Sequence, residues 1–334
     1  MKLLIWGTGA IGGTIGAYLA RAGHDITLVD LAAAHVEAIN TRGLTISGPI
    51  DEFTVRAPAL TPDAVQGQYR TILLCVKAQD TQAAARSLLP HLQPDGYVVS
   101  AQNGLNESVI AGIVGRERTV GCFVNLGADY LEPGRILFGG RGAVVLGELD
   151  GAITPRLKEL HRAFLDFEPE AIVTPNIWGF LWGKLAYGAM LFATALTNES
   201  IADALAAPEH RELFIALGQE VLSVAQSQGV RPEAFNGFDP LAFMPGTDRA
   251  VSLRSLDDMV AFNRCSAKTH SGIWRDLAVR KRRTEVDPLL GPVVEIGAQA
   301  GAPAPLTGRL ITLIHDIEQG KRQQELSNLE LLKG

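Results

Sequence analysis

The sequence predicts an α/β protein in which a domain built on a parallel sheet precedes an all-helical domain. Two observations carry this prediction. Apolar runs typical of buried strands alternate with segments of helical periodicity as far as residue 174. Beyond Pro175, which marks the exit from the last strand, helical periodicity takes over. We therefore expect two domains, residues 1–175 and residues 176–334.

Length, composition and charge place the chain among globular proteins. Its 334 residues are enough for two domains with a substantial core. A hydrophobic content of 47% and a charged content of 20% exclude global disorder. The formal net charge of -6 provides no basic field, which argues against nucleic acid as a main partner.

The sequence favours a cytoplasmic protein without a bound metal or a membrane partner. The three cysteines fit neither a disulfide framework nor a zinc site, because they are few and widely spaced: Cys75, Cys122 and Cys265. The first predicted strand starts almost at Met1, so we expect no signal peptide. The charge-poor run at residues 171–198 contains Pro175, Lys184 and several glycines, which favours a core helix over a membrane span.

The chain begins with a turn that is typical of dinucleotide binding. Residues 3–5 form an apolar run without polar alternation, as in a strand buried on both faces. Helical spacing follows until Gly23, so Gly7, Gly9 and Gly12 lie between a strand and a helix. Gly7 permits the tight turn, Gly9 lets a pyrophosphate approach the backbone, and Gly12 lets the helix pack on the strand.

The phosphates would bind the free N–H groups at the N-terminus of this helix. We therefore expect a Rossmann-type domain that binds its cofactor through Gly7, Thr8, Gly9, Ala10, Ile11 and Gly12. The alternative is an ordinary glycine-rich loop, because this pattern also occurs by chance.

Asp30 ends the predicted strand at residues 26–30, roughly twenty residues after the glycine turn. A carboxylate there can accept hydrogen bonds from the adenosine ribose and would repel a 2′-phosphate, so NAD is favoured over NADP. Alternatively, Asp30 only caps the helix predicted at residues 32–40.

Two further strands are predicted at residues 71–77 and 96–100, with a helix at residues 81–89 between them. Lys77 lies at the C-terminal end of the first strand, and Asn103 follows the second. Open parallel sheets bind ligands at the carboxyl ends of their strands. Both residues are therefore candidates for nicotinamide and substrate contacts. The alternative is a solvated loop residue in each case, and Gln102-Asn103-Gly104 contains a common turn dipeptide.

The other expected elements complete the two domains. In the first domain we expect a hairpin or extended excursion at 44–55, strands at 119–126, 142–147 and 171–174, a turn at Pro133-Gly134, and a helix at 154–167. In the second we expect helices at 199–229, 252–276, 285–301 and 306–319. Asp287 is a possible cap of the third of these helices, with Pro288 in its first turn.

Lys184 is the only formally charged residue between residues 171 and 198. The surrounding helix is apolar on nearly all sides and is expected to be buried. An ammonium group there is costly unless it meets an anion or lines a cleft, and it can donate a proton to a developing alkoxide. The alternative is a lysine that extends past its neighbours to water.

Five motifs in this order resemble the ketopantoate reductase (2-dehydropantoate 2-reductase) family over essentially the whole chain. They lie at residues 7–12, 76–79, 102–104, 181–185 and 283–287. The resemblance implies a Rossmann domain followed by an all-helical domain. It also implies that Lys184 is the general acid, that Glu285 lies near the substrate hydroxyl, that Asn103 holds substrate and nicotinamide ribose, and that Lys77 lines the cofactor site. Without the family, Glu285 would merely complement a helix dipole.

The chain departs from this family's pattern around the lysine. Members that reduce ketopantoate usually carry asparagines where this chain has Gly188 and Phe192. Their serine-rich motif is replaced by residues 268–276, where His270, Ser271 and Arg275 are candidate substrate contacts. NADP-using members tend to have an arginine just beyond the second strand, whereas Leu31 stands here.

We expect an NAD(H)-preferring oxidoreductase that interconverts a 2-oxo acid and its 2-hydroxy acid, with NADP possible by resemblance. The helical domain would serve substrate binding and assembly into a homodimer. The alternatives are a true 2-dehydropantoate 2-reductase with an altered pocket, a catabolic NAD-dependent dehydrogenase of hydroxy or sugar acids, and a regulator that senses NAD(H) without chemistry. Lys184 argues against the regulator, since a sensor needs no proton donor.

Overall fold

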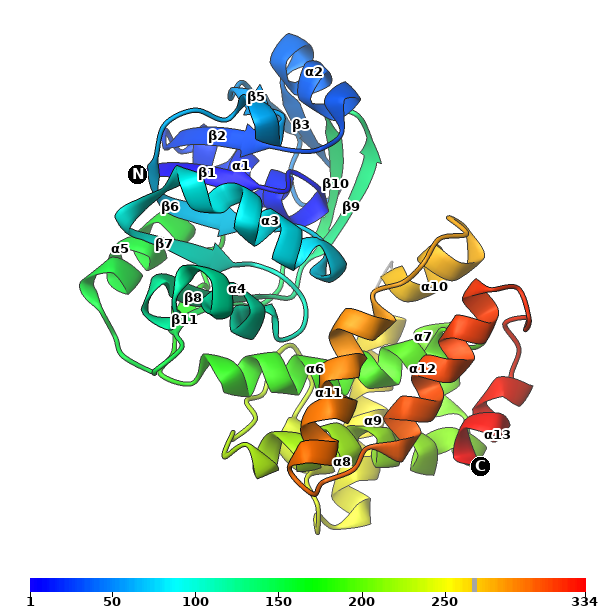
Figure 1. The fold of residues 1–334 in the computed structure, drawn as a ribbon. Coiled ribbons are helices and arrows are strands. Elements are labelled where there is room, and N and C mark those ends of the chain that lie inside the picture. Colours follow the sequence, from blue (N-terminus) through cyan, green and yellow to red (C-terminus); the bar gives the residue numbers. More distant parts are fainter. Residues whose placement is uncertain (266–268) are drawn as a thin grey trace. The chain divides into compact units, whose positions relative to one another are not determined.

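The N-terminal apolar run forms β1 (Lys2–Trp6), which lies inside an eight-stranded sheet (Figure 1). The computed structural model describes residues 1–265 and 269–334. They form two compact units, Met1–Ile177 and Trp178–Gly334. Successive residues of β1 serve opposite faces of the sheet: Leu3 and Ile5 belong to one hydrophobic cluster, whereas Leu4 belongs to another. This two-sided burial explains why the run lacks polar alternation.

The sheet has the strand order β12-β11-β8-β7-β6-β1-β2-β5. Its other strands are β2 (Asp25–Val29), β5 (Ala59–Leu60), β6 (Tyr69–Leu74), β7 (Leu92–Ser100), β8 (Thr119–Val124), β11 (Val144–Glu148) and β12 (Ile172–Val173). All neighbouring pairs are parallel except β8 and β11. The helices of this unit are α1 (Ala10–Arg21), α2 (Ala33–Arg42), α3 (Thr81–Leu88), α4 (Asn106–Val114) and α5 (Pro155–Phe164).

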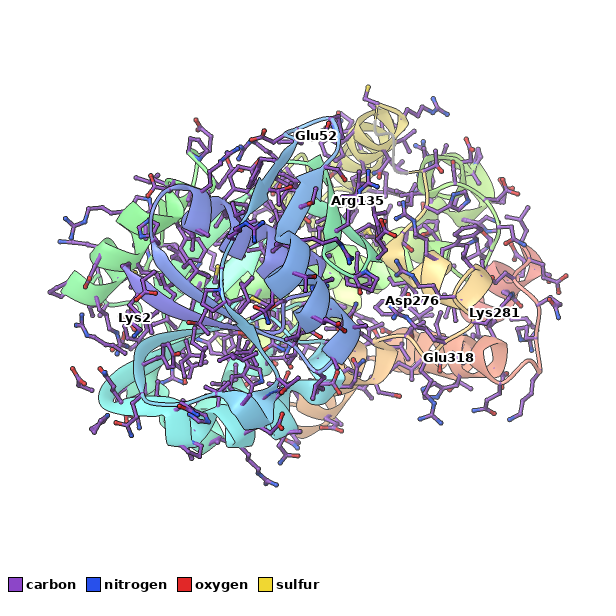
Figure 2. All side chains as sticks on the ribbon, turned by 90° about the horizontal axis from the view of Figure 1, so that it is seen from above. Lys2, Glu52, Arg135, Asp276, Lys281 and Glu318 are labelled. Atoms are coloured by element: carbon purple, nitrogen blue, oxygen red, sulfur yellow. The ribbon has the colours of Figure 1, made fainter. Side chains whose placement is uncertain are left out.

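A second, four-stranded sheet has the order β4-β3-β10-β9. Its strands are β3 (Leu44–Ser47), β4 (Phe53–Val55), β9 (Gly127–Glu132) and β10 (Arg135–Gly140). The hairpin expected at 44–55 is confirmed, and Figure 2 marks Glu52 at its tip and Arg135 at the start of β10. Strands β9 and β10 flank the predicted turn at Pro133-Gly134 but were not predicted. No side chain of β9 is fully buried, and in β10 only those of Ile136 and Phe138 are.

The second unit is helical. Its helices are α6 (Ile177–Thr194, which starts at the boundary), α7 (Ile201–Ala206), α8 (Arg211–Ser227), α9 (Arg249–Arg264), α10 (Gly272–Ala278), α11 (Val286–Gln299), α12 (Pro305–Glu318) and α13 (Ser327–Lys333). The fold class is therefore confirmed. Within the described ranges, none of the helices has the length and apolarity that crossing a membrane requires.

Two of the predicted helices are wrong as continuous elements. The helix expected at 199–229 is divided by Pro208, whose ring cannot follow α7 without breaking a helical hydrogen bond. The helix expected at 252–276 is also divided, because α9 ends at Arg264 and Ser271 caps a new helix, α10. Residues 266–268 of that prediction lie outside the described residues.

Candidate functional site

The glycine turn joins β1 to α1, and its three glycines meet different surroundings. Gly7 has a φ of +95°, and a Cβ there would lie 2.7 Å from the amide nitrogen of Val76. A Cβ on Gly12 would lie 2.1 Å from the carbonyl oxygen of Gly7. A Cβ on Gly9, in contrast, would meet no atom within 4 Å. Packing therefore requires Gly7 and Gly12, whereas Gly9 leaves open space beside the backbone.

The N-terminus of α1 fits an anionic group. Gly9 is the N-cap residue and contributes no capping side chain. The N–H groups of the first helical residues, Ala10, Ile11 and Gly12, have no acceptor within their own helix. Together with the positive end of the helix dipole and the open space at Gly9, they suit the pyrophosphate of a dinucleotide.

Asp30 is held between the glycine turn and the start of α2. Its Oδ2 accepts the N–H of Thr8 at 3.0 Å, and its Oδ1 accepts the N–H of Ala32 at 2.9 Å. Helix α2 has Ala32 as its N-cap residue, so Asp30 is not the N-cap residue itself but holds the N–H of Ala32 at the start of this helix. A carboxylate fixed by two N–H groups keeps lone pairs for further donors.

Thr8 is fully buried and shapes the turn from within. Its N–H donates to Asp30 and its hydroxyl donates to the carbonyl of Val29 at 3.1 Å. Its carbonyl oxygen lies 2.8 Å from Nε2 of His35. The N–H, hydroxyl and carbonyl groups of Thr8 thus all have protein partners. Thr8 would therefore contribute to cofactor binding by fixing the turn, without contacting the cofactor through these groups.

His35 is a residue of this site that the sequence reasoning missed. Its ring is buried, with Nε2 at the Thr8 carbonyl and Nδ1 accepting the N–H of Gly134 at 2.9 Å. The neutral tautomer with the proton on Nε2 satisfies both bonds. Because Gly134 lies 99 residues along the chain in the β9–β10 turn, no local pattern could reveal this link.

Lys77 and Asn103 lie at the same edge of the large sheet. Strands β6 and β7 are parallel neighbours, and β1 pairs with the other side of β6. The loops after these strands, together with the glycine turn, therefore emerge at one rim. Both side chains are exposed, which is the placement that a ligand contact needs.

Lys184 lies on α6, along the one stripe of this helix segment that is not fully buried. Lys184, Gly188 and Leu191 are half-buried and lie four and three residues apart, whereas Leu181 and Phe192 are buried. A Cβ on Gly188 would meet no atom within 4 Å. The helix is thus buried on most sides but leaves open space beside Lys184, on the same face.

Glu285 is the N-cap residue of α11, half-buried, and its side chain makes no capping hydrogen bond. The predicted cap, Asp287, is wrong: it lies inside the first turn and pairs with His315 at 2.9 Å. Pro288 lies in that first turn, as expected. The carboxyl group of Glu285 therefore lies at the positive end of the helix dipole without making a capping hydrogen bond.

The three candidates of the divergent segment lie around the start of α10. Ser271 is buried, and its Oγ accepts the N–H of Trp274 at 3.1 Å. The ring of His270 packs on the ring of Trp274 with centroids 4.1 Å apart. Arg275 is half-buried, and burial followed by the nearby charge of Arg280 lowers the pKa of its guanidinium. Ser271 thus has a structural role, which the sequence did not indicate.

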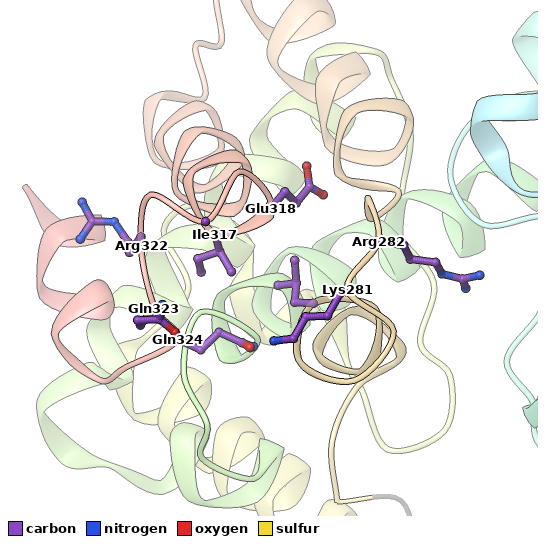
Figure 3. A pocket seen from close by; sticks show the side chains of 9 residues that line it. Lys281, Arg282, Ile317, Glu318, Arg322, Gln323 and Gln324 are labelled. Carbon is purple, nitrogen blue, oxygen red and sulfur yellow. The ribbon is translucent and has the colours of Figure 1, made fainter.

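A cavity of about 190 Å³ lies elsewhere in the second unit (Figure 3). Its lining includes none of the predicted site residues: Leu277, Lys281, Arg282, Ile317, Glu318, Gly320, Arg322, Gln323 and Gln324. Figure 3 shows Arg282 pointing away from the cavity, and its guanidinium pairs with Asp276 at 2.9 Å. Glu318 accepts both the N–H and the hydroxyl of Thr284. We assign no ligand to this cavity.

The part of the chain that the structure describes contains no group of three or more His, Cys, Asp or Glu residues arranged to hold a metal ion.

Comparison with known proteins identifies the family. A family model described as ketopantoate reductase PanE/ApbA matches residues 3–151, and one described as ketopantoate reductase PanE/ApbA C terminal matches residues 176–318. The 2-dehydropantoate 2-reductase of Pyrococcus horikoshii is 29% identical over 320 residues, which cover 94% of this chain and 96% of that protein. The enzyme of the same name from Halobacterium salinarum is 28% identical, covering 94% and 98%.

Solved structures agree with this result. A PanE/ApbA family ketopantoate reductase from Ralstonia eutropha JMP134 superimposes with a TM-score of 0.80 at 27% identity, covering 97% of this chain and 100% of that one. A D-mandelate dehydrogenase, solved with NADH and anilino(oxo)acetate, has a TM-score of 0.83 at 22% identity, covering 96% and 99%, which shows a shared fold. As its five motifs predicted, the chain belongs to the ketopantoate reductase family.

Proposed function

We propose that this protein reduces a 2-oxo acid to the 2-hydroxy acid, with NADH as the preferred cofactor and Lys184 as the proton donor. Membership of the family makes the chain an oxidoreductase that uses a nicotinamide cofactor. The assignment of Lys184 rests on its position. It is the one charged side chain of α6, and it lies on the partly exposed stripe of a helix that is otherwise buried.

The bound nicotinamide supplies the hydride, and the residues of the chain supply binding and the proton. The first turn of α1 binds the pyrophosphate, and Asp30 accepts hydrogen bonds from the adenosine ribose. Lys77 and Asn103 contact the cofactor and substrate at the rim of the sheet. Lys184 holds a proton on Nζ and transfers it to the substrate oxygen as negative charge develops there, and Glu285 orients the substrate hydroxyl.

The experiment that tests this role replaces Lys184 by Ala. General acid catalysis contributes about 10²–10⁴-fold, so turnover should fall by at least about 100-fold while the Kd for NADH changes little. Lys184→Arg keeps the charge but cannot release the proton and should be equally inactive. The matched control is Lys321→Ala, which removes an exposed lysine of the second unit. Unchanged turnover in Lys184→Ala would refute the assignment.

The preference for NADH rests on Asp30. Its carboxylate is fixed at the glycine turn, where it can accept ribose hydroxyls and repels a 2′-phosphate. The next residue, Leu31, is 80% exposed and offers no cation to a phosphate. The D-mandelate dehydrogenase of the same fold was solved with NADH, so the fold itself accommodates that cofactor.

Asp30→Ala combined with Leu31→Arg should therefore shift the ratio of kcat/KM values toward NADPH by about tenfold or more, which corresponds to about 1.4 kcal/mol. Glu52→Gln, an exposed charge change in the same unit, should leave the ratio as it is. An unchanged ratio in the double variant would mean that Asp30 only ties the turn to α2.

The substrate that we propose is a 2-oxo acid with a larger, more apolar side chain than ketopantoate. Gly188 leaves open space beside Lys184, and Phe192 replaces a second amide of the family's ketopantoate-reducing members. A site that has lost the hydrogen-bond partners of a substrate hydroxyl no longer selects for substrates that carry that hydroxyl. The second candidate is 2-dehydropantoate itself, the substrate in the names of the curated relatives. Assays of both acid classes with both cofactors distinguish the two.

We also propose that residues 1–175 bind the dinucleotide, that residues 176–334 bind substrate and form a homodimer, and that the protein acts in the cytoplasm. Sedimentation equilibrium measures the dimer directly, and a mass of 35.7 kDa at all concentrations would contradict it. Fractionation of the source cells tests the location.

A further inference from the structure

Three buried side chains connect the loops that carry Lys77 and Asn103. Gln102, Thr81 and Asn106 are 5%, 1% and 5% exposed. They come from three places: the loop after β7, the start of α3 and the start of α4. Buried polar groups are costly unless they are hydrogen-bonded, so the partners of these side chains indicate what they hold.

The hydrogen bonds form one connected chain between the two loops, and Gln102 donates toward both of its ends. Nε2 of Gln102 donates to the carbonyl of Val76 and to Oγ1 of Thr81, both at 2.8 Å. The Thr81 hydroxyl donates to Oδ1 of Asn106 at 3.0 Å, and Nδ2 of Asn106 donates to the carbonyl of Asn103 at 2.5 Å. Because each hydroxyl or amide donor is matched to a distinct acceptor, no member can be removed without leaving a buried group unpaired.

The two ends of this chain of bonds are backbone carbonyl groups next to, or part of, the two candidate contact residues at the rim of the sheet. Val76 immediately precedes Lys77, and the other end is the carbonyl of Asn103 itself. Gly104, with a φ of +91°, lets the backbone turn directly after Asn103. Lys77 and Asn103 themselves are exposed.

We propose that Gln102, Thr81 and Asn106 are positioning residues that hold Lys77 and Asn103 in a fixed mutual arrangement at the nicotinamide end of the site. This inference rests on the proposed function only in assigning cofactor and substrate contacts to Lys77 and Asn103. Thr81 is the central link, since its hydroxyl both accepts from Gln102 and donates to Asn106.

The first test needs no substrate. Thr81→Val keeps the branched shape but removes both hydrogen bonds, whereas Thr81→Ser keeps the hydroxyl. In Thr81→Val, amide hydrogen exchange at residues 76–79 and 102–105 should accelerate about tenfold or more, with residues 7–12 unaffected, because only the two linked loops lose their connection. Thr81→Ser should restore slow exchange. Equal acceleration throughout the first unit, or none in the two loops, would overturn the proposal.

The second test asks whether Thr81 acts through Asn103. Small displacements of a contact residue can lower the rate about 100-fold, so Thr81→Val should lower kcat/KM for a 2-oxo acid by about 10–100-fold, at temperatures well below unfolding. In an Asn103→Ala background the same substitution should cost a clearly smaller factor, since one of the two positioned side chains is already gone and only the effect on Lys77 remains. A merely structural role predicts the same factor in both backgrounds, and that result would contradict the proposal.

The two tests separate this inference from the proposed function. If the wild-type protein reduces no 2-oxo acid with either cofactor, the proposed function fails, whereas the exchange experiment still decides whether the two loops are linked.

Discussion

Glu107 presents a buried acid whose replacement should stabilise the protein. It lies in the first turn of α4, is 0% exposed, and neither carboxyl oxygen has a hydrogen-bond partner of ordinary geometry among the described residues. Burial raises the pKa of this carboxyl from 4.5 to about 7. The native state therefore binds a proton at pH values where the unfolded chain has already released it.

This difference in bound protons makes the free energy of unfolding depend on pH. Between about pH 4.5 and pH 7 the native state holds the extra proton, so the free energy of unfolding falls as the pH rises, and above pH 7 the full cost persists. At 1.36 kcal/mol per pH unit, a rise in pKa from 4.5 to about 7 costs about 3 kcal/mol. At pH 5 only about 1 kcal/mol of this cost is present.

Glu107→Gln has the same shape and cannot ionise. Relative to the wild type, its free energy of unfolding should be higher by about 3 kcal/mol at pH 8 but by only about 1 kcal/mol at pH 5. For a unit of this size, the larger value raises Tm by about 6–12 °C. Urea unfolding or calorimetry across this pH range measures the difference. Glu52→Gln, the exposed control on the β3–β4 hairpin, should show none (Figure 2). A difference that is independent of pH would refute the reasoning.

Three further predictions follow from the glycines and the stripe on α6. Gly9→Ala should leave Tm within about 1 °C, because its Cβ meets no atom within 4 Å, but should weaken NADH binding about tenfold or more by filling the approach to the backbone. Gly12→Ala should destabilise the first unit by about 1–3 kcal/mol, since its Cβ would overlap the Gly7 carbonyl; unfolding measurements that rank the two variants in the opposite order would contradict the geometry. Gly188→Asn should fold normally, lower kcat/KM for a bulky apolar 2-oxo acid by about tenfold or more and spare small ones, which kinetics with a matched pair of acids tests.

The sequence predicted the elements whose residues are buried on both faces. The run at residues 3–5 and the alternation of strands and helices up to residue 174 required no long-range information, because a doubly buried strand must be apolar throughout. The glycine turn was equally predictable, because its glycines stand between an apolar strand and a helix. The close contacts of Gly7 and Gly12 with Cys75 and Val76, which lie far along the chain, could not be predicted in the same way.

Features that depend on distant contacts were not predictable. Strand β9 is only partly buried, and β10 forms because it pairs with β3, whose residues lie 90 positions earlier in the chain, as Arg135 and Thr45 do. The link from His35 to Thr8 and Gly134, and the buried setting of Glu107, arise from packing that no local pattern encodes. In the second unit, Ser271 resembled a substrate contact because a serine that caps a helix and one that binds a ligand look alike in sequence.

The reaction itself is the most direct test of the proposed function. The purified protein, incubated with NADH and a set of 2-oxo acids that includes ketopantoate and larger apolar members, should oxidise NADH and form the 2-hydroxy acid, with kcat/KM at least about tenfold higher for NADH than for NADPH. Formation of no 2-hydroxy acid with either cofactor, or a preference for NADPH by the same factor, would contradict it.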